Sequence, residues 1–313
     1  MQPTPERLTQ MNEAALPAVS RIDVLRHLLH GAAFTRPGTR RTGLWRTATH
    51  FLRCVSHFEL FRQWYANPAH PALQEALAQR PSLVMCAVHP YLNTDWTARH
   101  RMAVVRQHYA LLNGPLSFMR FAPKQAIVLA HATEGLRVQL DKPGPFEHEG
   151  ELTINLFSEH SRLYTLVFTL GLQGSHRVAY AGGLQGMHST DALRTYRDLT
   201  HRMNGLRPRD LLVDAFRALC RALGVGRILA ICDARRVSSN AYFESSSRVF
   251  TSYDSAWTEN GGVAGADGFF ELSPLSTHRS AEDTPTRKRA QYRRRYTTLD
   301  DIAQQISRAV QAS

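Results

Sequence analysis

The sequence predicts an α/β (α+β) protein in which a helical N-terminal region packs on a mixed, mainly antiparallel sheet. Apolar residues recur at helical spacing from residue 21 to about residue 64. Apolar and polar residues then alternate in three successive stretches between residues 152 and 181. An amphipathic stretch from Gly205 leads into a short apolar run at residues 227–232. These patterns are typical of helices, of half-buried strands, and of a helix followed by a buried strand.

The first half of the chain is predicted to be mostly helical, with the first strands near its end. We expect helices over 21–64 broken by a loop at 34–38, a short helix over 72–79, a strand over 82–88, a helix over 94–112, and a hairpin of 126–132 with 136–140. Proline and glycine mark the breaks between these elements.

The second half has clearer strand signals. We expect strands over 152–157, 162–170 and 177–181, helices over 189–203 and 205–223, strands over 227–232 and 269–272, and a last helix over 299–310. The first three strands follow one another closely enough to be antiparallel, whereas the strand at 227–232 follows a helix and is of the parallel type.

The organisation that follows has three parts: a flexible N-terminus at 1–20, a helical region with the first strands at 21–145, and a sheet-and-helix core with a basic C-terminal segment at 146–313. A hydrophobic fraction of 43% and a charged fraction of 20% are ordinary for globular proteins. No stretch approaches the roughly 20 apolar residues that span a bilayer, and the N-terminus does not resemble a signal peptide.

The four cysteines are scattered and form no Cys-x-x-Cys pair. Free thiols in a reducing compartment are therefore expected, and neither cysteine nor histidine spacing predicts a metal site. The net charge of +12 and the pI near 10.1 favour acidic partners: nucleic acid, anionic lipid, phosphorylated cofactors or an acidic carrier protein. We expect a cytoplasmic protein.

Several short motifs resemble the VirK/YbjX family of bacterial proteins. They are His89-Pro90-Tyr91, Glu149-Gly150-Glu151-Leu152, Gly182-Gly183-Leu184-Gln185-Gly186, Gly205-Leu206-Arg207-Pro208, Tyr253-Asp254 with Trp257, and the basic run from Lys288 to Tyr296. The resemblance covers about residues 20–310. It implies a Gram-negative source and an association with virulence or the cell envelope, which would include peripheral contact with the inner membrane, but no agreed chemistry.

The order of elements over residues 150–233 also resembles the core of the GCN5-related N-acyltransferase superfamily. That resemblance implies that backbone amides at a helix start hold the pyrophosphate of acyl-CoA, because aligned N–H dipoles favour an anion. The residues expected to hold the donor are Gly205, Leu206, Arg207 and Arg209 at the helix start, with Leu184 and Gln185 lining the acyl channel. The superfamily's glycine-rich loop motif is absent, so an ordinary helix start with solvated arginines is the alternative.

Four residues are candidates for acid–base catalysis. Glu151 and Glu149 flank Gly150 at the entry to a strand, where a glutamate with a raised pKa deprotonates an acceptor amine; exposed edge charges are the alternative. His89 and Asp233 each follow a predicted strand, and the alternatives there are a histidine that shapes the Pro90 turn and a loop cap.

The basic run from Arg287 to Arg295 has six cations and is interleaved with Tyr292. It is suited to nucleic acid, to an acidic carrier protein or to anionic lipid, or it forms a solvated helix face near Asp300 and Asp301. Likewise, the N-terminal helices either pack on the sheet or lie on an anionic membrane.

Taken together, these patterns favour an acyltransferase that moves an acyl group from acyl-CoA or acyl carrier protein to an amine or hydroxyl of a peptide or lipid. The alternative is a non-catalytic envelope-associated factor that binds lipid or protein through its basic surface. A nucleic-acid-binding protein is the third hypothesis.

Overall fold

The structure, a computed structural model, describes residues 20–33, 40–65, 71–121, 125–159, 161–239, 252–276 and 285–312. The predicted flexible segment 1–20 lies outside these ranges except for Ser20. Internal contacts divide the chain into two compact units: residues 1–89 with 97–115, and residues 90–96 with 116–313. We call them the helical unit and the sheet unit.

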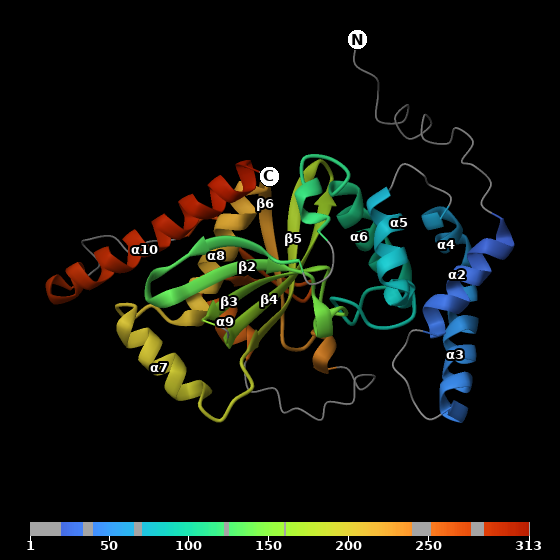
Figure 1. The fold of residues 1–313 in the computed structure, drawn as a ribbon, viewed down its shortest axis with the longest axis horizontal. Helices are drawn as coiled ribbons and strands as arrows, with labels where there is room; N and C mark the ends of the chain where they lie inside the picture. The colour runs from blue at the N-terminus through green and yellow to red at the C-terminus, as the bar shows by residue number, and fades with distance from the viewer. Residues whose placement is uncertain are drawn as a thin grey trace, which may run out of the picture. The chain divides into compact units, whose positions relative to one another are not determined.

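The helical unit contains six helical elements within its described residues (Figure 1). They are α2 (Arg21–Ala33), α3 (Arg40–Val55), α4 (Phe58–Tyr65), α5 (Pro71–Gln79), the 3-10 helix η2 (Pro81–Ala87) and α6 (Ala98–Leu111). Helix α2 buries Val24 and Leu28 and packs on η2, where Gly31 lies against the Pro81 carbonyl with no room for a Cβ. Thr97 caps α6 by accepting a hydrogen bond from the His100 amide.

The strand predicted over 82–88 is wrong, because these residues form η2. A short run that is apolar throughout cannot be assigned by period, since buried strands and buried helices share that pattern. Pro81 decides the case: it stands in the first turn of η2, and its fixed φ suits a helix start. The buried side chains from Leu83 to Ala87 are then covered by α2, α5 and α6.

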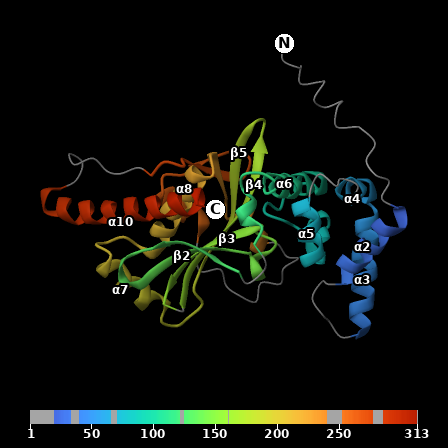
Figure 2. The ribbon, with the colours of Figure 1, turned by 45° about the horizontal axis from the view of Figure 1, so that its top comes forward.

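The sheet unit is built on one eight-stranded sheet with the order β1-β2-β3-β4-β5-β6-β8-β7 (Figures 1 and 2). The strands are β1 (Ile127–His131), β2 (Leu136–Asp141), β3 (Leu152–Ser158), β4 (Ser161–Gln173), β5 (His176–Gly186), β6 (Val225–Ile231), β7 (Val263–Ala264) and β8 (Phe269–Leu272). Every neighbouring pair is antiparallel except β5 with β6. The predicted mixed, mainly antiparallel sheet, with its hairpin and its three successive strands, is confirmed.

Two helices connect the parallel strands β5 and β6: α7 (Ala192–Arg202) and α8 (Pro208–Ala222). Helix α8 packs on β3, β4 and β6 and buries a continuous apolar face that includes Leu212, Phe216 and Leu219. The C-terminal helix α10 (Thr286–Gln311) packs on α8 and β1, and Figure 2 shows it beside α8. The short helix α9 (Tyr253–Glu259) completes the unit. Because α8 returns antiparallel to β5, its N-terminus lies at the end of the sheet where β5 finishes.

At that same end, β5 separates from β6. Their pairing stops at Ala181 and Ala230, although β5 continues for five residues to Gly186. The β5 strand also bulges, since Phe168 and Val167 of β4 pair with Ala181 and Gly183 and skip Gly182. One edge of β5 beyond the bulge is thus left without a β6 partner, which opens room for side chains that come from other elements.

Candidate functional site

A buried polar cluster lies where β5 leaves β6, and we define it as Glu149, Gln185 and Tyr253. Glu149 precedes β3, and its side chain lies against Gly183, where any Cβ would overlap the carboxylate. The Gln185 amide nitrogen donates to Glu149 Oε1 at 3.3 Å and to the Tyr253 hydroxyl at 2.5 Å. Three distant segments of the chain therefore meet around one carboxyl group.

The Glu149 carboxyl is set up to exchange a proton near neutral pH. The residue is only 6% exposed, and burial raises its pKa from 4.5 to about 7, against the opposing effects of the Gln185 hydrogen bond and the Arg236 charge. Its Oε2 is buried and has no hydrogen-bond partner among the described residues. A carboxyl in that state suits a general base.

Tyr253 begins α9 and is fully buried. Its hydroxyl accepts hydrogen bonds from Gln185 and from the Leu184 backbone amide on the free edge of β5. Burial, together with the nearby Glu149 charge, raises the pKa of Tyr253 well above its ordinary value. The phenol therefore keeps its proton and is a donor at physiological pH.

Asp233 holds the start of α9. Its carboxylate accepts hydrogen bonds from the Tyr253 amide at 3.0 Å and from the Ser252 hydroxyl at 2.7 Å. It also pairs with Arg236 at 3.0 Å, and the Arg236 guanidinium lies 5.0 Å from the centre of the Tyr253 ring. Asp233 thus positions Tyr253, in the manner of the loop cap that the sequence left open.

Glu151 is buried beside the cluster and lies deeper in the sheet. Its Oε1 accepts a hydrogen bond from the Tyr91 hydroxyl at 2.9 Å, and the same hydroxyl is 2.9 Å from Thr169 Oγ1. His89 belongs to the helical unit, where it is buried at the end of η2 and contacts the His50 ring edge-on at 4.8 Å. Of the four predicted acid–base residues, the structure brings Glu149 and Asp233 into one network through Tyr253.

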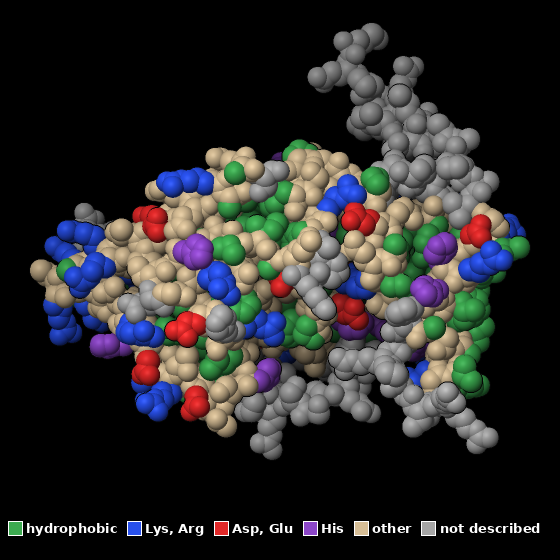
Figure 3. Space-filling model, in the orientation of Figure 1, with side chains coloured by type: hydrophobic (Ala, Val, Ile, Leu, Met, Phe, Trp, Pro, Cys, Tyr) green, Lys and Arg blue, Asp and Glu red, His purple; other side chains and the backbone are tan. Residues whose placement is uncertain are grey.

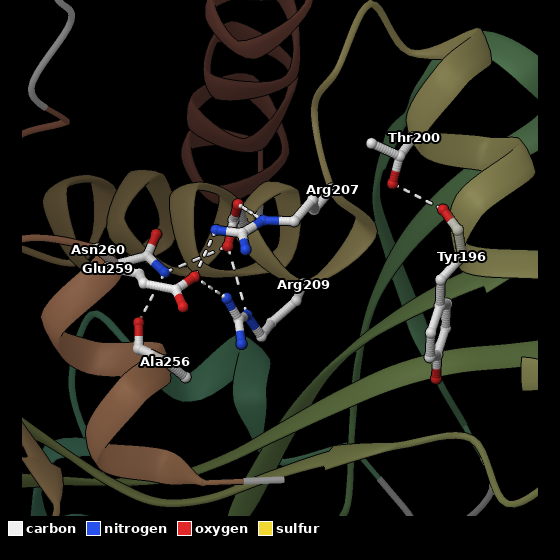
Figure 4. Close-up of polar contacts among 8 residues, drawn as sticks. Tyr196, Thr200, Arg207, Arg209, Ala256, Glu259 and Asn260 are labelled. Atoms are coloured by element: carbon white, nitrogen blue, oxygen red, sulfur yellow. Dashed lines mark hydrogen bonds and ion pairs between the residues drawn. The ribbon is translucent and has the colours of Figure 1, made fainter. Parts of the chain in front are cut away.

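A second arrangement, the arginine clamp, lies at the start of α8 and comprises Arg207, Arg209 and Glu259 (Figure 4). The two guanidiniums converge on one oxygen of Glu259, at 2.6 Å from Arg207 and 2.5 Å from Arg209. Arg207 also pairs with the buried Asp210 at 2.6 Å. Partial burial acts to raise the pKa of Glu259, but the hydrogen bonds and charges of the two arginines outweigh it and lower that pKa. The clamp therefore already holds an anion, the protein's own carboxylate.

A pocket of about 890 Å³ opens beside the clamp, between α7, the start of α8 and α10. Its cationic lining consists of Arg197, Arg207, Arg209 and Arg294, and His201 lines the same pocket. Its aromatic lining is Tyr164 stacked on Tyr196, with ring centroids 4.8 Å apart. The combination of cations and aromatic rings suits a phosphorylated ligand that has an apolar or planar part.

A second pocket of about 670 Å³ shares Thr200, Gly205 and Arg207 with the first. Its other side is formed by Tyr292, Arg295 and Tyr296 of α10 and by the end of α9. The Arg295 Nε is buried and has no acceptor among the described residues. Both pockets therefore meet at the loop before α8.

The predicted donor-binding residues divide between these places. Gly205, Arg207 and Arg209 line the first pocket, and Gly205 has a φ of +81°, which favours glycine. Leu206 and Leu184 are fully buried. Gln185 belongs to the polar cluster and does not line either pocket.

Helix α9 connects the polar cluster with the arginine clamp. It begins at Tyr253 and ends at Glu259, so six steps of 1.5 Å separate the two Cα atoms by about 9 Å. Sequence reasoning missed Tyr253 and Glu259 as site residues. The first was visible only as part of a family-like motif, and the second carries no local signal.

Metal-binding clusters and membrane-spanning helices are both absent from the described part of the chain. No group of three histidine, cysteine, aspartate or glutamate side chains among these residues is placed to hold a metal ion. In the same ranges, no helix has the length and apolar character needed to cross a membrane.

Comparison with known proteins supports the resemblance stated above. A family described as "Protein of unknown function (DUF535)" matches residues 40–308. The chain is 27% identical over 267 residues to the uncharacterized protein YbjX of Escherichia coli K12, covering 82% of this chain and 81% of that protein. Two uncharacterized proteins of Haemophilus influenzae match at 32% over 39% of this chain and 40% of theirs, and at 25% over 69% and 73%. No solved structure matches. The VirK/YbjX prediction is confirmed.

Proposed function

We propose an acyltransferase activity for this chain, which belongs to the DUF535 family. The donor is a thioester, acyl-CoA or acyl carrier protein, and the acceptor is an amine or a hydroxyl. The observation that carries the proposal is Glu149, a buried carboxyl with one oxygen unpartnered among the described residues and a pKa of about 7, set beside the free edge of β5. A buried ionisable group without a full set of partners is costly in a core and useful in a site.

In the proposed reaction Glu149 accepts one proton and Tyr253 donates another, and Gln185 positions both side chains. The acceptor nitrogen or oxygen attacks the thioester carbonyl, and its proton passes to Glu149 Oε2. The carbon–sulfur bond then breaks, and the leaving thiolate takes the proton of the Tyr253 hydroxyl, which accepts hydrogen bonds from Gln185 and Leu184 and is therefore oriented. Glu149 afterwards returns a proton to the tyrosine through solvent. No covalent enzyme intermediate is needed.

The clamp and the first pocket support the binding half of the proposal. The thioester arm of CoA or of a carrier protein has a phosphate near one end and sulfur at the other. Cations that line the first pocket suit the phosphate, and α9 spans the distance from the clamp toward the cluster. Because β5 and β6 are parallel and α8 connects them, the start of α8 lies at the end of the sheet where the cluster lies. The arginine clamp and the polar cluster are therefore at the same end of the sheet.

The experiment is thermal stabilisation at about 0.15 M salt, the physiological ionic strength. The ligands are acetyl-CoA, a long-chain acyl-CoA, free CoA, acyl carrier protein and a short DNA duplex. We expect saturable stabilisation by one acyl donor, with a weaker effect of free CoA. We expect Glu149→Gln to keep this stabilisation but to lose thiol release, measured with the acyl donor and a bacterial extract as the source of acceptor.

If no acyl donor stabilises the chain, the transferase proposal is abandoned. The second candidate is then a non-catalytic factor that binds lipid or protein through a basic surface, and the arginines of α10 are the observation that favours it. Binding of that kind falls steeply with salt and is indifferent to ligand identity. Stabilisation by the duplex alone would instead favour nucleic acid.

A further inference from the structure

The first thirteen residues of α10, which we call the basic half, are unlike the rest of that helix. Residues 286–298 include six cations and no acidic residue. The cations are Arg287, Lys288, Arg289, Arg293, Arg294 and Arg295, and all but Arg295 are exposed. The buried anchors of the helix, Leu299, Ile302 and Ile306, all lie in its other half. Figure 3 shows basic side chains gathered over this end of α10.

The charge of the basic half works against the helix that contains it. A helix N-terminus has a partial positive charge, so cations in the first turn, such as Arg287 and Lys288, are unfavourable there. The apolar anchors of α10 contribute nothing here, since they lie beyond residue 298. An anionic partner bound over the first turn would remove this penalty.

The basic half also forms a wall of the proposed donor site. Gln291 and Arg294 line the first pocket, and Tyr292, Arg295 and Tyr296 line the second. A partner bound to the exposed side of this helix half is therefore next to both pockets.

The distribution of charge favours a protein over a small phosphorylated donor. Arg207 and Arg209, the cations nearest the start of α8, already share the carboxylates of Asp210 and Glu259. Most of the exposed cations of the basic half do not line either pocket, so a CoA molecule in the first pocket would not use them. An acyl donor carried by an acidic protein would use them, because its negative charge is spread over the surface of that protein.

Two features of the same residues count against other polyanions. Membrane-surface helices insert apolar side chains beside their cations, and the basic half has no Leu, Ile, Val, Phe, Met or Trp. Single-stranded nucleic acid requires accessible aromatic rings. Here Tyr292 and Tyr296 are half-buried, 5.9 Å apart, and line the second pocket, while the Arg295 guanidinium already lies over the Tyr292 ring at 5.9 Å.

We infer that the basic half of α10 docks an acidic acyl carrier protein, whose phosphopantetheine arm enters the first pocket with the acyl chain. This inference rests on the proposed function and names its donor. Docking is electrostatic, so it is fast and salt-dependent. The apo carrier protein, which lacks the arm, binds through the same surface but more weakly.

The test compares two charge-reversal variants of the full chain. The docking variant is Arg287→Glu/Lys288→Glu/Arg293→Glu. The control variant is Arg21→Glu/Arg99→Glu/Arg106→Glu, which reverses three exposed arginines of the helical unit. Both remove the same amount of charge. Glutamate is favourable in the first turn, where Arg287 and Lys288 lie, and is a good helix former at position 293, so the docking variant keeps α10 folded.

Binding is measured by biolayer interferometry with apo and hexadecanoyl acyl carrier protein, with hexadecanoyl-CoA in parallel, and with phosphatidylglycerol vesicles and a DNA duplex as competitors. We expect the docking variant to bind both carrier forms at least about tenfold more weakly, because three attractive charge contacts become repulsive. The control variant should bind within about twofold of the wild type, and hexadecanoyl-CoA affinity should be unchanged in both.

Two results overturn the inference while the proposed function stands: hexadecanoyl-CoA binds but the carrier protein does not, or both variants lose carrier binding equally. Stronger binding of vesicles or duplex through the basic half also overturns it. If neither donor binds, the proposed function fails with it.

Discussion

Replacing Glu149 by glutamine should stabilise the protein, and by an amount that depends on pH. Glutamine keeps the shape of the carboxyl and the hydrogen bond from Gln185, but it cannot ionise. The shift of the Glu149 pKa from 4.5 to about 7 corresponds to about 3 kcal/mol of free energy, at 1.36 kcal/mol per pKa unit. That is the cost of holding this carboxylate ionised in the folded sheet unit.

The direction of this pH dependence follows from proton binding by Glu149. The folded chain binds the Glu149 proton more tightly than the unfolded chain does, so the unfolded state is the first to release it as the pH rises. Wild-type stability attributable to this group is complete below pH 4.5 and is lost as the pH rises to about 7. The substituted glutamine resembles the protonated glutamic acid, since both side chains are uncharged and both place a donor group at the position of Oε2. The two proteins should therefore be equally stable in acid and differ by about 3 kcal/mol at mildly alkaline pH.

The assay is urea unfolding of both proteins at about pH 5 and at about pH 8.5, monitored by tryptophan fluorescence, to which the buried Trp257 in α9 contributes. Every other titrating group is common to the two proteins and cancels in their difference. A difference that stays constant across this range would refute the burial argument. A wild type that becomes the more stable protein at high pH would show that Glu149 has a cationic partner strong enough to reverse the effect of burial.

Three further predictions concern neighbouring residues. Tyr253→Phe should lower the rate of thiol release at least about tenfold with donor affinity unchanged, because the hydroxyl donates its proton in the transfer step and does not line the first pocket; equal rates would remove Tyr253 from the mechanism. Glu259→Gln should tighten binding of acyl-CoA a few-fold, because it frees Arg207 and Arg209 of a competing carboxylate worth up to about 1 kcal/mol; isothermal titration calorimetry measures it, and weaker binding would contradict the clamp. Gly183→Ala should lower the melting temperature markedly, whereas Gly174→Ala, in open space at a turn, should cost only its backbone strain.

The parts of the fold that were predictable have a repeating local signal. Alternation over 152–181 fixes three strands, since a period of two is unlike any helix. The apolar run at 82–88 has no period, and it forms the helix η2 where a strand is predicted. The last helix was predicted only from residue 299, where its apolar anchors begin, because the basic half lacks apolar residues from which a period could be read.

The candidate site was predictable residue by residue but not as an assembly. Glu149 and Gln185 stand out locally, as a charge at a strand entry and as part of a glycine-rich motif. Their common neighbour Tyr253 lies 68 residues beyond Gln185, and Glu259 lies 50 residues beyond Arg209. A single sequence contains no signal that joins such distant positions, because the contacts depend on where the crossover through α8 brings α9.

Comparison of three buried carboxyls of the sheet unit shows why Glu149 is the one to test. Asp210 is satisfied by Arg207, Arg209 and Asn260, and Glu151 by Tyr91. Glu149 has one hydrogen bond to Gln185 and, among the described residues, nothing on its second oxygen. An apolar side chain there would avoid a penalty of about 3 kcal/mol. The glycine at position 183 nevertheless leaves its carboxylate room, and the edge of β5 beside it, which has no β6 partner, is where the proposed thioester would lie. Glu149 weakens the fold when it is ionised, and Gly183 leaves room for its side chain. A chemical role explains these two facts better than packing does.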